Sequence, residues 1–160
     1  MTATTQSQIH TSHSDSTIYR KSPLLRNALR GNGLFSLIGG VTFFLAAQPI
    51  ADFSGLAGAE IIAGIDGTGF IRLLGVGLLP WAMALFWLAS RPVIKNGLAW
   101  EVIGGDMLWV AGSALLLMTQ ALPLNTTGSW MVLILADVVL MFAVVQYVGI
   151  RQNVHNLLND

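Results

Sequence analysis

Residues 32–49 read NGLFSLIGGVTFFLAAQP, and residues 106–123 read DMLWVAGSALLLMTQALP. Each stretch is an apolar run that begins on a short polar residue and ends on proline. Aligned without a gap, the two stretches place Asn32 over Asp106 and share three identical residues, the last of them the terminal proline. Three identities do not establish homology, but the pairing indicates a protein built from two similar helical hairpins.

The composition is typical of an integral membrane protein. The chain has 160 residues, of which 54% are hydrophobic and 10% are charged, whereas soluble domains carry about a quarter charged residues. Basic and acidic residues number 8 each, so the chain has no net positive charge of the kind that would indicate a nucleic-acid partner. The absence of cysteine excludes disulfides and thiolate metal sites. His10, His13 and His155 all lie outside the apolar runs, which excludes buried bis-histidine haem ligation. We therefore expect no metal and no cofactor.

Four apolar segments lie at 33–53, 69–91, 102–123 and 128–150. Each is long enough to cross a hydrocarbon core of about 30 Å at about 1.5 Å per residue. They are uninterrupted and rich in Leu and Ala, which argues against strands. The predicted fold class is all-α, an integral membrane four-helix bundle that two repeated transmembrane hairpins would build.

The similarity between the hairpins extends weakly into their second segments. Trp87 and Arg91 at the end of the second segment correspond to Tyr147 and Arg151 at the end of the fourth. Two hairpins with the same orientation would form a parallel repeat, related by an axis along the membrane normal.

The chain divides into four predicted regions. Residues 1–19 are rich in Thr, Ser and Gln and are predicted to form a disordered cytoplasmic tail. Residues 20–32 carry four basic residues and are predicted to be a lead-in at the membrane interface, or simply a topology signal. The transmembrane domain is predicted at 33–151, and a short cytoplasmic tail at 152–160.

The basic residues predict the orientation in the membrane. With the N-terminus inside, seven of the eight basic residues lie on the cytoplasmic side and Arg72 alone lies on the other side. This split follows the positive-inside rule. We expect a multi-pass protein of the bacterial inner membrane with both termini in the cytoplasm.

Ionisable residues inside the spans are the main candidates for a site, because each costs about 2.5–3.5 kcal/mol at the bilayer centre. Asp137 lies near mid-depth, and we expect its carboxyl to be protonated, hydrogen-bonded or paired with Arg72, which can instead extend outward to the interface. Asp106 lies nearer the cytoplasmic end and is expected to meet Arg30 or Asn32 in a structural polar cluster. Asp137, Arg72, Asp106 and Asn32 are thus the binding or transport candidates, and no catalytic residue is identified.

Small and polar residues predict where the helices pack. The first segment carries a stripe of them from Asn32 to Ala47. In the third segment the stripe repeats every seven residues, at Asp106, Ser113 and Gln120. The stripes form either a polar path or close-packing surfaces, and close packing is the commoner use of such residues. We expect Gly40 and Gly112 to lie where the first and third segments meet.

Two further stretches carry a family resemblance, RNALRGNGLFS at 26–36 and DMLWVAG at 106–112. With the size, four spans and short loops, they make the chain similar to small four-helix bacterial inner-membrane proteins, loosely the DoxX-like families, over residues 22–151. The resemblance implies no catalytic residues. The small multidrug-resistance transporters carry a glutamate within their first helix, whereas this chain has no acid there before Asp52.

Three classes of function follow from these patterns. The first is a non-enzymatic accessory or assembly subunit that packs with itself or with a larger membrane complex, which the small-residue stripes favour. The alternative is a small oligomeric transporter or channel for protons, cations or a small solute, using Asp137 or the Asp106 stripe. A membrane enzyme or redox subunit acting on a lipid or quinone would need clustered acids or histidines, which the spans lack.

Overall fold

The computed structural model describes residues 23–158, and the predicted tail at 1–19 lies outside the described residues. Four helices are long and apolar enough to cross a membrane. They are α1 (Pro23–Leu45), α3 (Gly67–Ser90), α4 (Asn96–Thr119) and α5 (Thr126–Leu158). The predicted all-α four-helix membrane bundle is confirmed.

The boundaries of the first helix differ from those of its apolar run. α1 begins at Pro23, inside the predicted lead-in, so that Arg26 and Arg30 belong to the helix. It ends at Leu45, and the chain restarts as the short helix α2 (Ala47–Ser54). Pro49 has no backbone N–H to donate to the preceding turn, but in the first turn of a new helix no such bond is required.

The two hairpins break at matching places. α4 ends at Thr119, and the gapless alignment of the two opening stretches pairs Thr119 with Leu45, where α1 ends. Beyond this point the hairpins differ, because the first continues into α2 whereas the second turns through a short connection to α5. At its far end α5 continues to Leu158, so the predicted tail is helical over most of its length.

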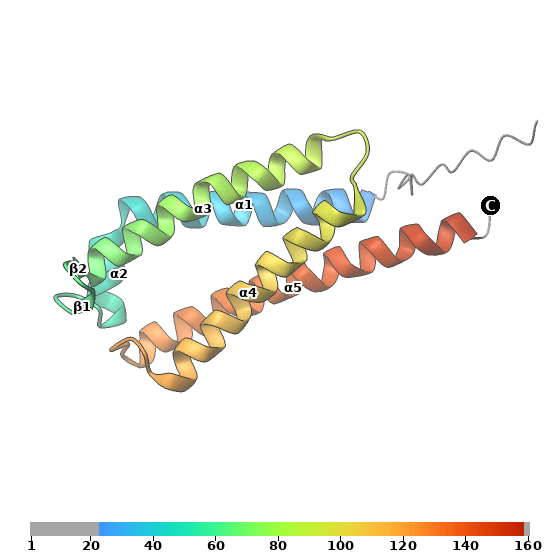
Figure 1. Ribbon diagram of the computed structural model, residues 1–160. Helices are drawn as coiled ribbons and strands as arrows, with labels where there is room; N and C mark the ends of the chain where they lie inside the picture. Colours follow the sequence, from blue (N-terminus) through green and yellow to red (C-terminus); the bar gives the residue numbers. More distant parts are fainter. Residues whose placement is uncertain (1–22, 159–160) are drawn as a thin grey trace, which may run out of the picture.

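The bundle has two distinct ends. One end, called the inner end here, holds the start of α1, the connection between α3 and α4, and the end of α5 (Figure 1). The opposite, outer end holds a β-hairpin that the sequence analysis did not predict, formed by β1 (Glu60–Ile62) and β2 (Ile65–Asp66). Asp66 then caps α3, since its Oδ1 accepts a hydrogen bond from the backbone N–H of Gly69 at 2.8 Å.

Asn125 ties the two hairpins together at the outer end. Its side-chain oxygen accepts a hydrogen bond from the N–H of Gly128 at 2.8 Å and so caps α5. Its Nδ2 donates to the carbonyl of Phe53 at 3.0 Å, and its backbone N–H donates to the carbonyl of Ser54 at 3.0 Å. These bonds hold the end of α2 against the start of α5.

α1 and α3 pack closely through glycine. A Cβ atom added to Gly75 would lie 2.7 Å from the carbonyl oxygen of Gly40, so the backbones meet with no room for a side chain. The prediction that Gly40 lies at a helix contact is confirmed, but its partner helix is the second span rather than the third. The same prediction for Gly112 is wrong, because a Cβ there would meet nothing within 4 Å.

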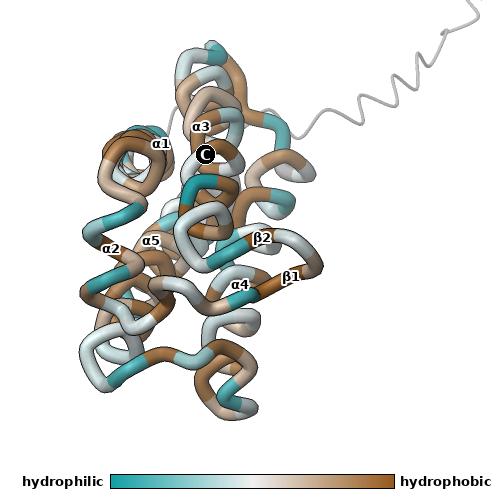
Figure 2. The backbone as a smooth tube through the Cα atoms, turned by 90° about the vertical axis from the view of Figure 1, so that its left-hand side faces the viewer, coloured by the Kyte–Doolittle hydropathy of each residue, from teal (hydrophilic) through white to brown (hydrophobic). Residues whose placement is uncertain are grey.

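The arrangement of the hairpins is asymmetric. α5 packs along α1 as well as along α4, whereas α3 and α4 diverge toward the outer end (Figures 1 and 2). At the inner end a cluster of buried apolar side chains joins α1, α3, α4 and α5; it includes Leu29, Leu85, Val102 and Ile150. This cluster therefore closes the space between the two hairpins at the inner end.

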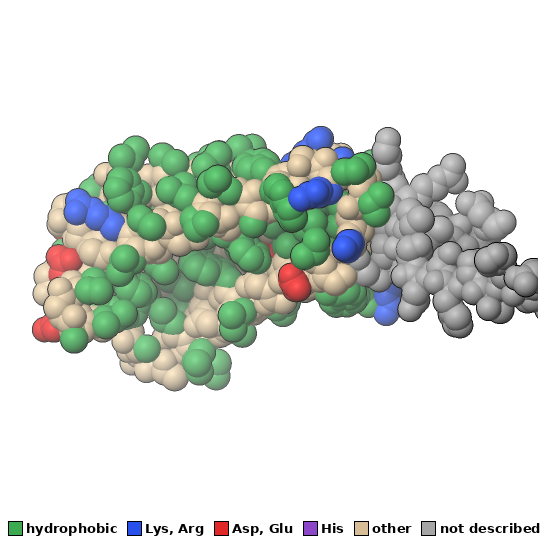
Figure 3. Space-filling view, turned by 45° about the horizontal axis from the view of Figure 1, so that its top comes forward, with side chains coloured by type: hydrophobic (Ala, Val, Ile, Leu, Met, Phe, Trp, Pro, Cys, Tyr) green, Lys and Arg blue, Asp and Glu red, His purple; other side chains and the backbone are tan. Residues whose placement is uncertain are grey.

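The surface is apolar along the spans and basic at the inner end. Hydrophobic side chains cover most of the visible face, and Lys and Arg gather toward one end (Figure 3). The guanidinium of Arg91 lies 4.0 Å from the ring centre of Trp87, and that of Arg151 lies 5.1 Å from the ring centre of Tyr147. The predicted correspondence between these two pairs therefore holds in three dimensions.

Candidate functional site

Three buried polar side chains meet inside the bundle. Asp106 of α4, Asn32 of α1 and Gln146 of α5 are 2%, 1% and 0% exposed. The Oδ2 atom of Asp106 accepts hydrogen bonds from Asn32 Nδ2 at 2.7 Å and from Gln146 Nε2 at 3.1 Å. The indole of Trp81 on α3 interacts with the same carboxyl. The carboxyl of Asp106 therefore interacts with a side chain from each of the other three spanning helices.

The contact between Asn32 and Asp106 confirms one of the two partners that the sequence predicts for this acid. The other, Arg30, is exposed and takes no part. Asn32 and Asp106 are also the residues that the gapless alignment superposes. Equivalent residues of two repeated hairpins can touch each other only close to the axis that relates the hairpins. The hydrogen bond thus lies where a parallel repeat would place its centre.

Gln146 is the member of the cluster that the sequence analysis missed. It is the lone amide side chain in the apolar segment 128–150, and this was the available signal. An amide in a span is expected to hydrogen-bond across helices, because lipid offers it no partner. Its partner lies 40 residues away in the sequence, and only the packing of α5 against α4 reveals it.

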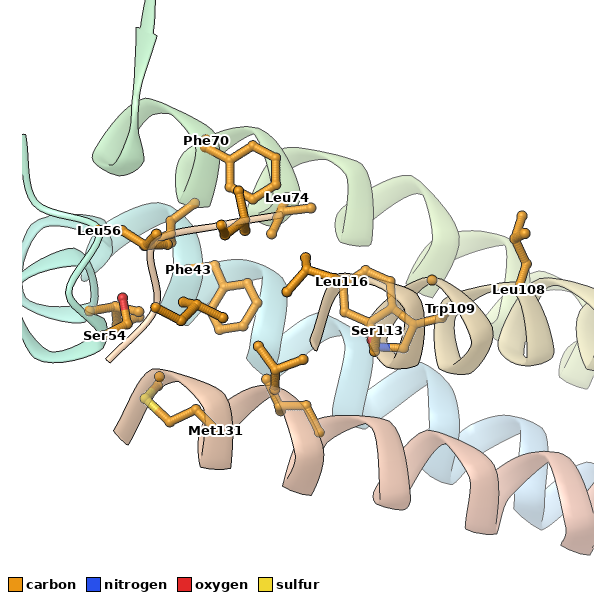
Figure 4. A pocket seen from close by; sticks show the side chains of 18 of the residues that line it. Phe43, Ser54, Leu56, Phe70, Leu74, Leu108, Trp109, Ser113, Leu116 and Met131 are labelled. Atoms are coloured by element: carbon orange, nitrogen blue, oxygen red, sulfur yellow. The ribbon is translucent and has the colours of Figure 1, made fainter. Parts of the chain in front are cut away.

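Two cavities lie between the hairpins. The inner cavity, of about 500 Å³, is bounded by all four spans, and Asn32, Ser36, Trp81 and Asp106 lie on its wall. The outer cavity, of about 400 Å³, is almost wholly apolar, with Phe43, Phe70, Leu74, Leu116 and Met131 among its walls (Figure 4). The cavities share five lining residues: Phe43, Leu74, Gly105, Trp109 and Leu135. Both volumes fall in the range of about 300–1,000 Å³ that is typical of small-molecule sites.

Two buried polar atoms near the cluster have no hydrogen-bond partner, the Nε1 of Trp109 and the Oε1 of Gln146. Trp109 lies on the wall of both cavities, and Figure 4 shows it beside Ser113 on the wall of the outer cavity. A buried donor left unpaired costs about 1–3 kcal/mol. A ligand acceptor would satisfy the indole N–H of Trp109, whereas a ligand donor would satisfy the amide oxygen of Gln146.

Asp137 lies apart from this cluster. It is exposed near the middle of α5 and forms no hydrogen bond or ion pair with any described residue. Arg72 is also exposed. The expected pair between Arg72 and Asp137 is not formed. Residues at helical spacing around Asp137 share its exposed face, and all are apolar: Trp130, Leu133, Ile134, Leu140, Met141 and Val144.

The acidic and amide side chains of the cluster are defined by their contacts. Among residues 23–158, no three acidic or histidine side chains converge as a metal site would require. Asp106 accepts hydrogen bonds from two neutral amides, an arrangement that holds helices together, and the residue lies on the wall of the inner cavity.

Comparisons with models of protein families, with curated proteins and with solved structures find no match to this chain. The resemblance to DoxX-like proteins therefore stays a prediction from the sequence. What the chain does has to be argued from its own residues.

Proposed function

We propose that the protein is a non-enzymatic membrane subunit that associates laterally through the exposed face of α5 centred on Asp137. The observation that carries this proposal is a carboxyl at mid-span that faces outward and has no partner among the described residues. The partner is a second copy of the chain or a transmembrane helix of a larger complex.

The energetics of Asp137 favour an additional helix. An acidic side chain at the bilayer centre costs about 2.5–3.5 kcal/mol on insertion scales. Asp137 lies about 16 Å along α5 from Thr126, as about 1.5 Å per residue gives, so its carboxyl is far from either end of the span. A donor on a neighbouring helix would satisfy it inside the membrane.

The surroundings of Asp137 form a surface that can pack against such a helix. Leu133 and Ile134 lie one turn before it, and Leu140 and Met141 lie one turn after it; the four are between 36% and 57% exposed. An apolar stripe with one central polar residue resembles the seams in which a single hydrogen bond fixes the register of two helices.

The membrane and the orientation are part of the proposal. We place the protein in a bacterial inner membrane with its inner end in the cytoplasm, supported by the basic residues there: Arg26, Arg30, Arg91, Lys95 and Arg151. A cysteine at Gly58 should react with an impermeant maleimide added outside intact cells, whereas one at Gln152 should not. The reverse pattern would contradict this orientation.

Cysteine cross-linking tests the association, because the native chain has no cysteine. Single cysteines at Leu133, Met141 and Val144 on the Asp137 face should form cross-links in native membranes on mild oxidation. A matched cysteine at Met83 on α3, which is 70% exposed, should not. A product of twice the chain mass identifies a second copy, and mass spectrometry of any other product identifies a different partner.

Asp137→Leu should weaken the association about three- to thirtyfold, since interhelical hydrogen bonds in membranes contribute about 0.6–2 kcal/mol. Glu101→Leu, which removes an exposed acid near the inner end of α4, is the matched control and should leave the association unchanged. Equal cross-linking at Met83 and Met141, or no loss in Asp137→Leu, would overturn the proposal.

The transporter alternative has its main support in Asp106, which lines a cavity inside the bundle. Its stripe offers less support, since Ser113 and Gly112 border the apolar outer cavity and Gln120 is exposed at the end of α4. A pH-dependent solute flux in proteoliposomes that Asp106→Asn abolishes without loss of folding would favour this alternative over the accessory subunit.

A further inference from the structure

The space between the hairpins arises from a broken symmetry. In a two-hairpin repeat, α3 should meet α4 as α5 meets α1, because each pair joins the second helix of one hairpin to the first helix of the other. α5 does pack along α1, but α3 and α4 separate toward the outer end (Figure 1). The two cavities lie in the space between them. Leu73 of α3 and Leu108 of α4, which border this space, are 52% and 74% exposed. The space therefore opens sideways toward the lipid.

The inner cavity is also mostly apolar, and its small polar part includes Asn32, Ser36 and Asp106. Asp106 is the sole ionisable residue on its wall within the described chain. The neighbours that hydrogen-bond its carboxyl, Asn32 and Gln146, are neutral, so no cation of the described chain compensates a negative charge there. Trp81, Trp109 and Phe35 line the same cavity. A carboxyl on the wall of a cavity that aromatic rings also line can recognise an ammonium group through charge and cation–π attraction.

The outer cavity suits an apolar chain. It continues from the inner cavity past the shared residues Phe43 and Trp109, and its walls are almost wholly hydrophobic (Figure 4). Asp106 is well inside the candidate span Gly97–Thr119, so a molecule that reaches it has to enter the bundle and not merely lie at the interface. A single-chain amphiphile fits a mostly apolar space with a small polar region at Asp106.

We propose that the space between α3 and α4 binds a membrane-soluble, single-chain amphiphile with a protonated amine headgroup. The ammonium group lies at Asp106, among Trp81 and Trp109, and the apolar chain extends along the outer cavity toward Leu116 and Met131. The molecule enters from the lipid between α3 and α4. This site is separate from the α5 face, so it stands whether or not the protein associates through Asp137.

The experiment measures the quenching of tryptophan fluorescence by three amphiphiles of equal chain length. The full chain in nanodiscs of zwitterionic lipid is titrated with ω-bromododecylamine, ω-bromododecanol and ω-bromododecanoic acid. The amine should quench saturably and bind about tenfold more tightly than the alcohol, as expected for a charge-assisted hydrogen bond. The acid should bind most weakly.

Two variants locate the headgroup and the chain. Asp106→Asn keeps an oxygen that can accept from Asn32 and Gln146, and it should lower the affinity for the amine to that for the alcohol. Gly112→Phe should fill the outer cavity and abolish saturable quenching. Its control is Gly104→Phe, since both glycines lie on α4 with nothing within 4 Å of an added Cβ, but Gly104 borders neither cavity.

Elution as a single species checks that each variant folds. If Asp106→Asn does not fold, the comparison of Gly112→Phe with Gly104→Phe still decides the position of the chain, and the wild-type comparison of amine with alcohol decides the headgroup. Equal affinities for the amine and the alcohol in the wild type would overturn the proposal. So would saturable binding to Gly112→Phe that matches binding to Gly104→Phe, since the bound chain would then lie outside the outer cavity.

Discussion

Asp106 and Asp137 are two acids well inside spanning helices, but their burial and their hydrogen bonding are opposite. Asp106 is 2% exposed and accepts hydrogen bonds from two other helices, whereas Asp137 is exposed and bonds to no described residue. Both sit in similar apolar sequence. The face of the helix, rather than the residue type, decides whether a carboxyl ties the bundle together or bonds to no described residue.

The glycines differ in a similar way, because some lie at a contact between helices and another does not. Gly40 and Gly75 bring the backbones of α1 and α3 together, whereas Gly112, in a comparable stripe of small residues, faces open space. A stripe of small residues therefore marks a surface that can pack closely, and only the neighbouring helix determines whether it does.

Asp106→Leu should produce the largest effect on stability. The substitution leaves Asn32 Nδ2 and Gln146 Nε2 buried without an acceptor, and each such group costs about 1–3 kcal/mol. We expect the free energy of unfolding in detergent micelles, measured by denaturant titration, to fall by about 2–6 kcal/mol. Asp106→Asn should cost clearly less, because its amide oxygen can accept both bonds.

Glu101→Leu is the control for loss of an acid on the same helix, since Glu101 is exposed and should change stability by no more than about 0.5 kcal/mol. If Asp106→Leu were as stable as Glu101→Leu, the buried cluster would not hold the helices together. The two acids would then differ in position but not in role.

The sequence was sufficient to predict the four spans and one central contact. Long apolar runs determine the helices, and the depth of Asp106 gave Asn32 as one of its two expected partners, beside Arg30. It was not sufficient to assign Gln146 or Gly112, because their surroundings depend on how α4 and α5 are rotated about their axes. The break after Leu45 was also missed, since an apolar run carries no mark of a turn other than the proline three residues into α2.

Gly75→Leu should produce the next largest effect, a loss of about 1–3 kcal/mol of stability through overpacking. Its Cβ would lie 2.7 Å from the carbonyl oxygen of Gly40 and 2.8 Å from the backbone nitrogen of Phe44, so α1 and α3 would have to separate. Gly112→Leu is the matched control, because both substitutions gain the same helix propensity. Thermal unfolding in micelles should rank Gly75→Leu well below Gly112→Leu. Equal stability of the two variants would show that the α1–α3 contact tolerates a side chain.

The smallest expected effect is the coupling between Arg72 and Asp137, which two double-mutant cycles compare with the coupling inside the cluster. Asn32→Leu and Asp106→Leu share a hydrogen bond, so their effects on unfolding should depart from additivity by about 0.5–3 kcal/mol. Arg72→Leu and Asp137→Leu share no contact within the described chain, and their effects should add to within about 0.3–0.5 kcal/mol.

The second cycle should be measured at low and at high ratios of protein to lipid, because association through α5 could bring the Asp137 of one copy near the Arg72 of another. Additivity at low ratio with coupling at high ratio would assign the interaction to two copies and support Asp137 as a lateral contact. Coupling that persists at low ratio would mean that Arg72 reaches Asp137 within one chain. That result would remove the contrast between the two acids, since each would then have a partner inside its own bundle.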